Sequence, residues 1–139
     1  MAKIIKMTEQ QFLKLRKEMG VKEICNSRID FIGYARVGHM DGSSKYRPQK
    51  YSSWSEYWEN KFHCPVAPTN KICDCCCEEK IESDFIVGHI IKIDTKELFL
   101  YPICKECNDK GKGGENHQFL ASEQLMQPFI LSDAEIESD

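Results

Sequence analysis

The sequence contains no apolar run long enough for a membrane-spanning helix. Such a helix needs about 18 or more consecutive apolar residues, and no stretch of this chain approaches that length. The first ten residues, MAKIIKMTEQ, also lack the long apolar region and the cleavage site of a secretory signal. These absences argue against helical membrane proteins and secreted proteins, and they predict a location in the cytosol.

Without a secretory signal, the eight cysteines of the 139-residue chain do not indicate a disulfide framework, because thiols in the cytosol stay reduced. The length corresponds to one domain with a modest core, which a bound metal would help to stabilise. Cysteines paired in C-x-x-C spacing in a cytosolic chain indicate a metal site.

The net charge of −3 hides an asymmetry along the chain. Residues 1–50 carry 11 Lys+Arg against 5 Asp+Glu, whereas residues 51–139 carry 8 against 17. The basic first third suits contact with nucleic acid or with an acidic protein face. It equally suits contact with the acidic remainder of the same molecule, and charge alone does not decide between these interpretations.

The first 50 residues predict one helix followed by strand-like sequence. Thr8 and Gln11 form a capping-box pattern, which predicts a helix over residues 9–19. Residues 24–38 contain several β-branched and aromatic side chains and are more typical of a strand than of a helix. The polar residues after them predict a loop, in which His39 is expected to be exposed.

A second helix is predicted after Ser52 or Ser53, because Glu56 completes a capping pattern with Ser53. Four aromatic residues recur there at helical spacing: Tyr51, Trp54, Trp58 and Phe62. Such a row could stack nucleic-acid bases. We favour a core position, because large aromatic side chains dominate burial in small domains.

The second half of the chain predicts a β-hairpin and short elements around it. Residues 85–93 and 98–103 are apolar, β-prone runs separated by a polar turn. Residues 104–108 predict a short turn or helix, and residues 118–131 predict a strand and a short helix. The acidic residues 132–139 contain no base and predict a disordered tail.

The two C-x-x-C pairs are Cys73 with Cys76 and Cys104 with Cys107. Two residues between ligands allow one tight turn to aim two thiolates at one ion. Four thiolates in a tetrahedron leave no open coordination position, which indicates a structural zinc rather than a catalytic one. The sequence therefore predicts one Zn²⁺ per chain, bound by these four cysteines.

The other cysteines leave a second site open. It would be formed by His63, Cys64, Cys75 and Cys77. We favour the simpler interpretation, in which these thiols and Cys25 are small apolar or exposed side chains.

The segment from Cys73 to Lys110 resembles the zinc-stabilised branch of the HNH, or ββα-metal, endonucleases. The matching elements are the first C-x-x-C pair, the sequence VGHII with His89, and YPICKECN ending in Asn108. The resemblance covers about a quarter of the chain. It implies a treble-clef module (knuckle, hairpin, short helix) around the zinc, with a separate catalytic Mg²⁺ if the protein is a nuclease.

Carried over residue by residue, the resemblance makes His89 the general base and Asn108 a ligand of the catalytic metal. Gly88 occupies the position of the metal-binding aspartate, and Phe99 lies near the position of the orienting asparagine. Two of four catalytic elements are thus missing. A site for Mg²⁺ needs hard oxygen ligands, usually with a carboxylate among them, so we favour a structural role for His89.

The predicted fold is α+β, a small single domain. Residues 1–71 are expected to form helices and strands that pack on the zinc module, residues 72–131 form that treble-clef module, and residues 132–139 form the tail. The favoured function is a non-catalytic binding protein that contacts a protein partner. Its predicted partner surface consists of Arg28, Arg36, Arg47 and Lys50.

Small chains with degenerate nuclease-like zinc folds are similar to products of phages and mobile elements. This resemblance implies, as one specific form of the function, an inhibitor of a host nuclease defence of the anti-CRISPR type. The partner would then belong to a nucleic-acid-processing complex. The alternatives are an HNH-type, metal-dependent DNA endonuclease and a DNA-binding regulator with weak nucleic-acid binding through the same basic residues.

Overall fold

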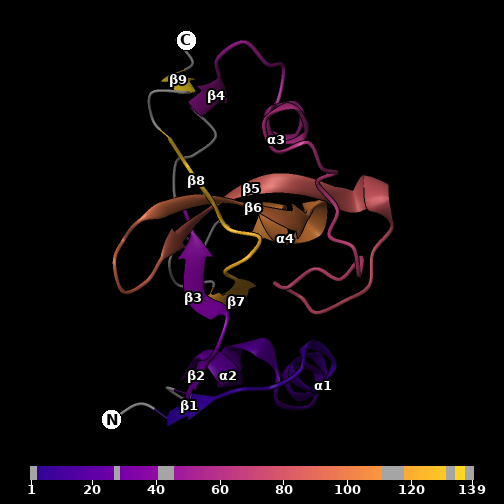
Figure 1. The fold of residues 1–139 in the computed structure, drawn as a ribbon, viewed down its shortest axis with the longest axis vertical. Helices are drawn as coiled ribbons and strands as arrows, with labels where there is room; N and C mark the ends of the chain where they lie inside the picture. The colour runs from indigo at the N-terminus through magenta and orange to yellow at the C-terminus, as the bar shows by residue number, and fades with distance from the viewer. Residues whose placement is uncertain (1–2, 27–28, 41–45, 111–117, 131–133, 137–139) are drawn as a thin grey trace.

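The structure, a computed structural model, describes residues 3–26, 29–40, 46–110, 118–130 and 134–136 (Figure 1). These residues form the predicted α+β fold, in which a five-stranded antiparallel sheet is the largest element. The strands of this sheet, in spatial order, are β7 (Phe119–Ser122), β3 (Tyr34–His39), β5 (Phe85–Lys92), β6 (Leu98–Cys104) and β8 (Gln127–Pro128).

The predicted hairpin is the centre of this sheet. β5 and β6 pair over their full length, with Gly88 opposite Tyr101 and His89 opposite Leu100. Their β-branched and aromatic residues suit a strand that is covered on both faces. α3 (Trp54–Phe62) and α4 (Lys105–Lys110) lie on opposite sides of the hairpin ribbon in Figure 1.

β3 joins the first part of the chain to the zinc module. This strand pairs with β7 on one side and with β5 on the other. The first 71 residues therefore contribute a strand to the same sheet as the hairpin, which makes the described protein one domain. None of its described helices is both long and apolar enough to cross a bilayer.

The capping box at Thr8 begins α1 (Glu9–Met19) as predicted. Thr8 Oγ1 accepts a hydrogen bond from Gln11 N at 3.1 Å, and the Gln11 side chain accepts one from Thr8 N at 3.0 Å. Gly20, with φ of 90°, ends the helix in a conformation that side-chain-bearing residues disfavour. A second helix, α2 (Val21–Asn26), follows directly. The sequence pattern did not predict it, and its last three residues lie in the stretch that was expected to be strand-like.

α3 begins after Ser53, whose hydroxyl accepts a hydrogen bond from Glu56 N at 3.1 Å. The core position predicted for its aromatic residues is confirmed. Trp58 is 2% exposed, and the other three aromatic residues of the row, Tyr51, Trp54 and Phe62, are half-buried and pack against the core. A row that is covered in this way is not an open platform for stacking bases.

Two short sheets flank the central one. β1 (Lys3–Ile5) pairs in parallel with β2 (Ile29–Phe31), and β4 (Tyr46–Pro48) pairs in antiparallel fashion with β9 (Ala134–Ile136). β9 lies within the tail that the sequence predicted to be disordered. For these three residues the expectation fails, because strand pairing uses backbone groups and does not require apolar side chains.

Residues 118–130 differ from their prediction in one respect. The predicted strand is present as β7. In place of the expected short helix, the described residues form a tight turn, in which Leu125 N donates to Ser122 O at 3.0 Å. β8 then pairs with β6, and this pairing holds the segment extended.

The core consists of two clusters. The larger one lies around the hairpin and includes the metal-site cysteines. The smaller one joins α1, α2 and β2 to β7, and it consists of Phe12, Ile24, Cys25, Phe31 and Leu120. Phe12 stacks on Tyr34 with ring centroids 4.1 Å apart. The N-terminal helices are thus fixed to the sheet by their own apolar cluster.

Candidate metal centre and the HNH positions

The first cysteine pair lies in a knuckle, which we define as residues 71–80. Cys73 N donates to Glu78 O at 3.0 Å, and Cys77 N donates to Cys73 O at 2.6 Å. Cys77 adopts φ of 61°, in the left-handed region, and this conformation reverses the chain just after Cys76. The knuckle therefore aims Cys73 and Cys76 in the same direction.

The second pair joins the hairpin to the short helix. Cys104 is the last residue of β6, and Cys107 lies in the first turn of α4. An ion pair of 3.6 Å between Lys80 and Glu106 links the knuckle to α4. The order of knuckle, hairpin and helix is the one expected for a treble clef.

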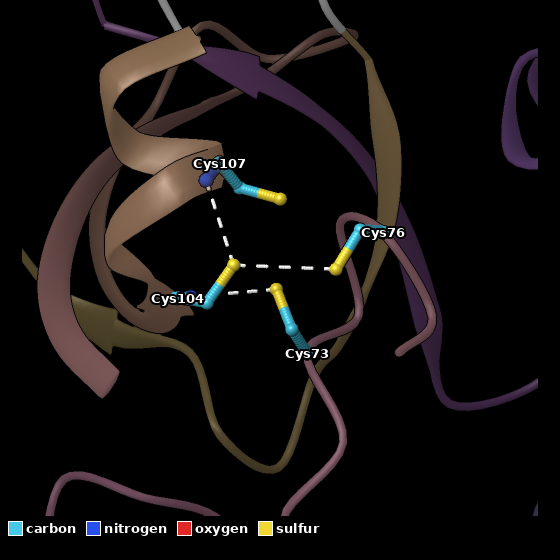
Figure 2. A group of neighbouring side chains, drawn as sticks. All are labelled: Cys73, Cys76, Cys104 and Cys107. Carbon is cyan, nitrogen blue, oxygen red and sulfur yellow. Dashed lines mark hydrogen bonds between the residues drawn. The ribbon is translucent and has the colours of Figure 1, made fainter. Parts of the chain in front are cut away.

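The four cysteines converge on one point, as Figure 2 shows. Their sulfur atoms all lie within 4.8 Å of one another, and those of Cys76 and Cys104 are 4.0 Å apart. Sulfur atoms bound at about 2.3 Å to one tetrahedral zinc lie about 3.8 Å apart. The cluster thus fits one metal ion, and a set of four thiolates is typical of a structural Zn²⁺ site.

The surroundings of the sulfur atoms suit thiolates bound to a cation. Cys104 N donates to Cys73 Sγ at 3.4 Å, and Cys107 N donates to Cys104 Sγ at 3.5 Å. The hydrogen bond with Cys107, together with burial, raises the pKa of Cys76 to about 12. The hydrogen bond with Cys73 likewise raises the pKa of Cys107. Without a metal ion, the crowding of four thiols disfavours their ionised forms. A bound divalent cation stabilises the negative charge of the thiolates, so metal binding is coupled to loss of the thiol protons.

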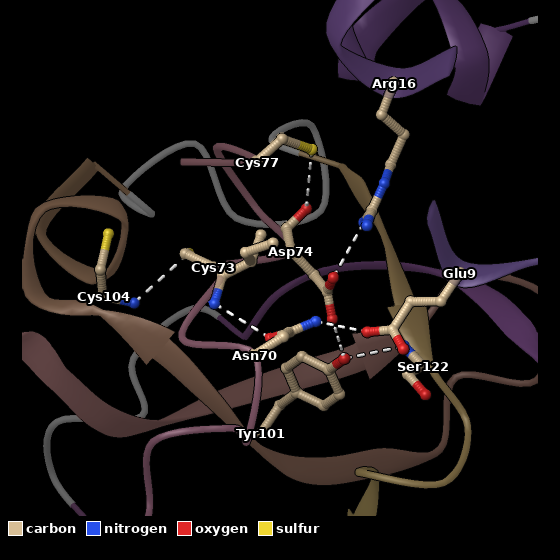
Figure 3. Close-up of polar contacts among 10 residues, drawn as sticks. Glu9, Arg16, Asn70, Cys73, Asp74, Cys77, Tyr101, Cys104 and Ser122 are labelled. Atoms are coloured by element: carbon tan, nitrogen blue, oxygen red, sulfur yellow. Dashed lines mark hydrogen bonds and ion pairs between the residues drawn. The ribbon is translucent and has the colours of Figure 1, made fainter. Parts of the chain in front are cut away.

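A buried ion pair joins the knuckle to α1 (Figure 3). Arg16 Nη1 donates to Asp74 Oδ1 at 2.9 Å, and the side chain of Arg16 is 3% exposed. Tyr101 Oη donates to the other oxygen of Asp74, and Ser122 N donates to Tyr101 Oη at 2.7 Å. Asp74 lies between the two ligands of the knuckle, so this network ties the metal centre to α1, β6 and β7.

Sequence reasoning missed this network. A weak signal was present: Arg16 follows Phe12 by four residues, which places it on the same face of α1 as that core residue. The Arg16 guanidinium indeed lies 4.5 Å from the centre of the Phe12 ring. Nothing in the spacing of Asp74 predicted its partner, which is 58 residues away in the chain.

The second metal site that the sequence left open is not assembled. Cys75 and Cys77 are buried, whereas His63 and Cys64 are exposed. Within the described ranges, Cys73, Cys76, Cys104 and Cys107 form the one group of three or more His, Cys, Asp or Glu side chains that could hold a metal. None of the eight cysteines forms a disulfide.

His39 is not the exposed loop residue that the sequence predicted. It is the last residue of β3, pairs with Ile90 of β5, and is 4% exposed. Its Nε2 lies 3.8 Å from Cys75 Sγ. The strand continues to His39 because this residue pairs with Ile90 of β5, a tertiary condition that local polarity does not reveal.

Gly88, where the HNH resemblance expects an aspartate, lies against the side chain of Ile103. A Cβ atom on Gly88 would lie 2.7 Å from Ile103 Cδ1 and 3.4 Å from Asn108 Oδ1. Residue 88 therefore faces Asn108 and α4. Successive side chains of a strand point to opposite faces, so His89 faces away from Asn108. The structure does not bring the two candidate catalytic residues together.

His89 instead lies in an aromatic environment on the α3 side of the hairpin. Its ring centre is 5.2 Å from that of Trp54 and 5.0 Å from that of Phe129. Its Nε2 is buried and has no hydrogen-bond partner among the described residues. Burial lowers the pKa of His89 to about 4, which keeps the imidazole neutral near pH 7.

The structure describes three of the four predicted partner-binding residues, and they lie on different strands or segments. Arg28 lies outside the described residues. Arg36 is in β3, with its side chain 25% exposed and 4.0 Å from Asp30. Arg47 in β4 and Lys50 after it are exposed. Figure 1 places β4 on the α3 side of the hairpin, away from the helices and strands of the N-terminal region.

Comparison with family models, curated proteins and solved structures finds no significant match for this chain.

Proposed function

We propose that this protein is a zinc-stabilised binding protein that carries no hydrolytic site of its own. The zinc organises the knuckle, the hairpin and α4, and function is exerted through contact with a protein partner. A fold does not dictate a function, so a nuclease-like module can serve as a scaffold.

The arrangement around Gly88 is the observation that carries this proposal. A metal-dependent nuclease site needs a base and a metal-binding carboxylate held close to one reacting position. Ile103 occupies the space in which a side chain of residue 88 would begin. His89 lies on the other face, and its lowered pKa makes it a poor base near neutral pH.

The partner surface that we propose lies around β4 and the segment that leads to α3. Arg47 and Lys50 are exposed there, on a chain whose net charge is −3. Exposed basic residues of this kind favour an acidic face of a partner, by steering and by complementarity. A nucleic-acid-processing complex, as in the anti-CRISPR type of inhibitor, is the specific form that we propose.

A cleavage assay tests the absence of catalysis. The zinc-loaded protein is incubated with supercoiled plasmid and either Mg²⁺ or Mn²⁺, beside an active HNH nuclease as the positive control. We expect no nicking above the level of His89→Ala, its matched variant. Metal-dependent nicking that disappears in His89→Ala would make the protein a nuclease.

A binding assay tests the protein partner. The protein is immobilised and exposed to extract from its native host, beside an Arg47→Glu/Lys50→Glu variant with the same zinc content. A purified candidate from the first sample should bind the wild type and lose most of its affinity for the variant. Equal affinity for the wild type and the variant would show that the partner surface does not include Arg47 and Lys50.

A further inference from the structure

A cavity of about 490 Å³ lies beside the knuckle. It is surrounded by the start of α1, the turn between β2 and β3, the segment before the knuckle and the turn after β7. Two carboxylates, Glu9 and Asp74, belong to its lining, and the described residues of this lining include no lysine, arginine or histidine. The volume lies within the range of about 300–1,000 Å³ that is typical of small-ligand sites. The cavity can therefore hold a small ligand, and its charged groups are acidic.

The ion pair of Asp74 fixes the inner side of the cavity. Asp74 is 9% exposed, and its two oxygens accept hydrogen bonds from Arg16 Nη1 and Tyr101 Oη. Ser122, another residue of the lining, donates its backbone N–H to Tyr101 Oη at 2.7 Å. A wall that is already ordered lowers the entropic cost of binding a ligand. Because Arg16 compensates the charge of Asp74, this carboxylate adds little net charge to the cavity.

The carboxylate of Glu9 has no such compensation. It accepts a hydrogen bond from Asn70 Nδ2, and Asn70 Oδ1 in turn accepts one from Ile72 N at 3.0 Å; Figure 3 shows Glu9 and Asn70 beside Asp74. Among the described residues, no cationic side chain forms an ion pair with Glu9. A neutral amide holds the carboxylate in place and leaves its negative charge unbalanced, so the cavity suits a ligand with one positive charge.

Three further polar side chains of the lining offer hydrogen-bond acceptors: Tyr34, Thr69 and Gln124. Within the described part of the chain, none of these side chains forms a hydrogen bond with another residue. Their oxygens can therefore accept hydrogen bonds from a ligand. Ile32 and Leu125 give the same cavity an apolar side, and Ile32 is 57% exposed. A cation with several N–H groups and an aliphatic stem would use both kinds of lining.

An anion would not suit the cavity, although α1 begins beside it. The N-terminal end of a helix attracts negative charge, but the protein already supplies that charge here. Glu9 lies in the first turn of α1, and Thr8 Oγ1 accepts a hydrogen bond from Gln11 N at 3.1 Å. A second anion would lie next to the carboxylate of Glu9, which disfavours it.

We propose that this cavity binds an alkylguanidinium group, the group that ends an arginine side chain. A guanidinium carries one positive charge and five N–H donors in a plane, and it is more weakly hydrated than an ammonium group. Glu9 would accept a charge-assisted hydrogen bond from it, and its methylene stem would lie against Ile32 and Leu125. The cavity contains neither Arg47 nor Lys50, so its test does not depend on the partner surface proposed above.

The test is a titration of ¹⁵N-labelled, zinc-loaded full-length protein at constant ionic strength, with amide shifts as the readout. The probes are butylguanidinium, butylammonium, the peptide acetyl-Ala-Arg-Ala-amide and its neutral citrulline analogue. We expect saturable shifts at residues 32–34, 69–70 and 124–125 with both guanidinium probes, and weaker binding of the other two. Tighter binding of the arginine peptide than of butylguanidinium assigns the site to arginine side chains of proteins, and the reverse order assigns it to small molecules.

Charge variants decide where the probe binds. Glu9→Gln removes the unbalanced charge and can keep a hydrogen bond with Asn70, and it should weaken guanidinium binding about tenfold. Glu18→Gln removes the same charge from the exposed pair with Lys14 on the same helix and should leave the affinity unchanged. Thr69→Lys places a cation at the cavity and should weaken binding, whereas Thr69→Gln, of similar size, should have a much smaller effect.

Three outcomes would overturn the proposal. They are the absence of saturable shifts at the cavity, binding of butylammonium or the citrulline peptide as tightly as their guanidinium counterparts, and an equal loss of affinity in Glu18→Gln and Glu9→Gln. Zinc content and thermal unfolding of each variant are measured first. Should Glu9→Gln fail to fold, the decision rests on Thr69→Lys against Thr69→Gln, because Thr69 is exposed and exposed substitutions have small effects on stability.

Discussion

Arg16 and Asp74 form an ion pair of 2.9 Å that is almost completely shielded from solvent. The pair joins the first helix of the chain to the residue that lies between two metal ligands. A buried charge without its partner is strongly destabilising, although the complete pair adds little over apolar residues of similar volume. The two residues should therefore behave as a unit.

Removing one partner should cost more than removing both. We expect Arg16→Met to lower the free energy of unfolding by about 3 kcal/mol, because the Asp74 carboxylate stays buried without a cation. Arg16→Met/Asp74→Asn should be more stable than the sum of the two single variants implies, by at least about 1 kcal/mol. Urea unfolding at a fixed zinc concentration measures both quantities.

The control for this experiment is Lys14→Met. Lys14 pairs with Glu18 at 4.0 Å on the exposed face of the same helix, and exposed pairs contribute about 1 kcal/mol or less. If Arg16→Met cost no more than Lys14→Met, the ion pair would not couple α1 to the knuckle.

We expect one zinc ion per chain and a loss of folding when a ligand is changed. Cys73→Ser or Cys107→Ser should abolish tight zinc binding and cooperative unfolding, because binding of a structural zinc is coupled to folding. Elemental analysis after purification without added metal, together with thermal unfolding, measures these effects. Cys64→Ser, which changes an exposed thiol, is the matched control and should keep full zinc content. An equal loss in that variant would point to a different ligand set.

Substitution of Gly88 should show that a side chain at this position and the side chain of Ile103 require the same space. Gly88→Asp should destabilise the protein by about 1–3 kcal/mol, because its Cβ meets Ile103 Cδ1 at 2.7 Å. In Gly88→Asp/Ile103→Ala the space is available, so the double variant should be more stable than additivity predicts. Urea unfolding measures the coupling. Gly88→Asp alone should not produce plasmid cleavage, since His89 stays on the other face of the hairpin.

His89 should make stability depend on pH. Its folded pKa of about 4 lies below the unfolded value of about 6.5, so the unfolded chain binds the proton more readily between these values. Titration of His89 therefore leaves the free energy of unfolding unchanged above about pH 6.5. As the pH falls from 6.5 toward 4, it lowers the free energy of unfolding by at most about 1.4 kcal/mol per pH unit. Urea unfolding at pH 7.5 and 5.5 should show a smaller decrease for His89→Phe than for the wild type. Zinc release in acid affects both proteins, so identical decreases would show that His89 contributes nothing.

Local patterns were sufficient for much of the fold. Thr8 with Gln11 and Ser53 with Glu56 predicted helix starts because capping involves residues three positions apart. The apolar runs on each side of a polar turn predicted the hairpin, and C-x-x-C spacing predicted ligands that the structure brings within 4.8 Å of one another. Each of these signals needs only a few neighbouring residues.

Longer-range features followed from tertiary contacts alone. The strand at Ala134–Ile136 exists because β4 is available to pair with it. His39 is buried where it pairs with Ile90 of β5 and lies beside the ring of Phe119. The partner of Arg16 lies 58 residues away, so no local window contains both charges.

The sequence by itself predicted the four-cysteine cluster that could hold a metal ion, since the spacing within each pair aims two thiols at one point. It also showed that Gly88 cannot supply a carboxylate. Only the tertiary structure decided on which face of the hairpin His89 lies, because this depends on the elements that pack on each face of the strand. Trp54 and Phe129 cover His89, and Ile103 fills the space beside Gly88; packing, rather than residue identity, separates the two positions.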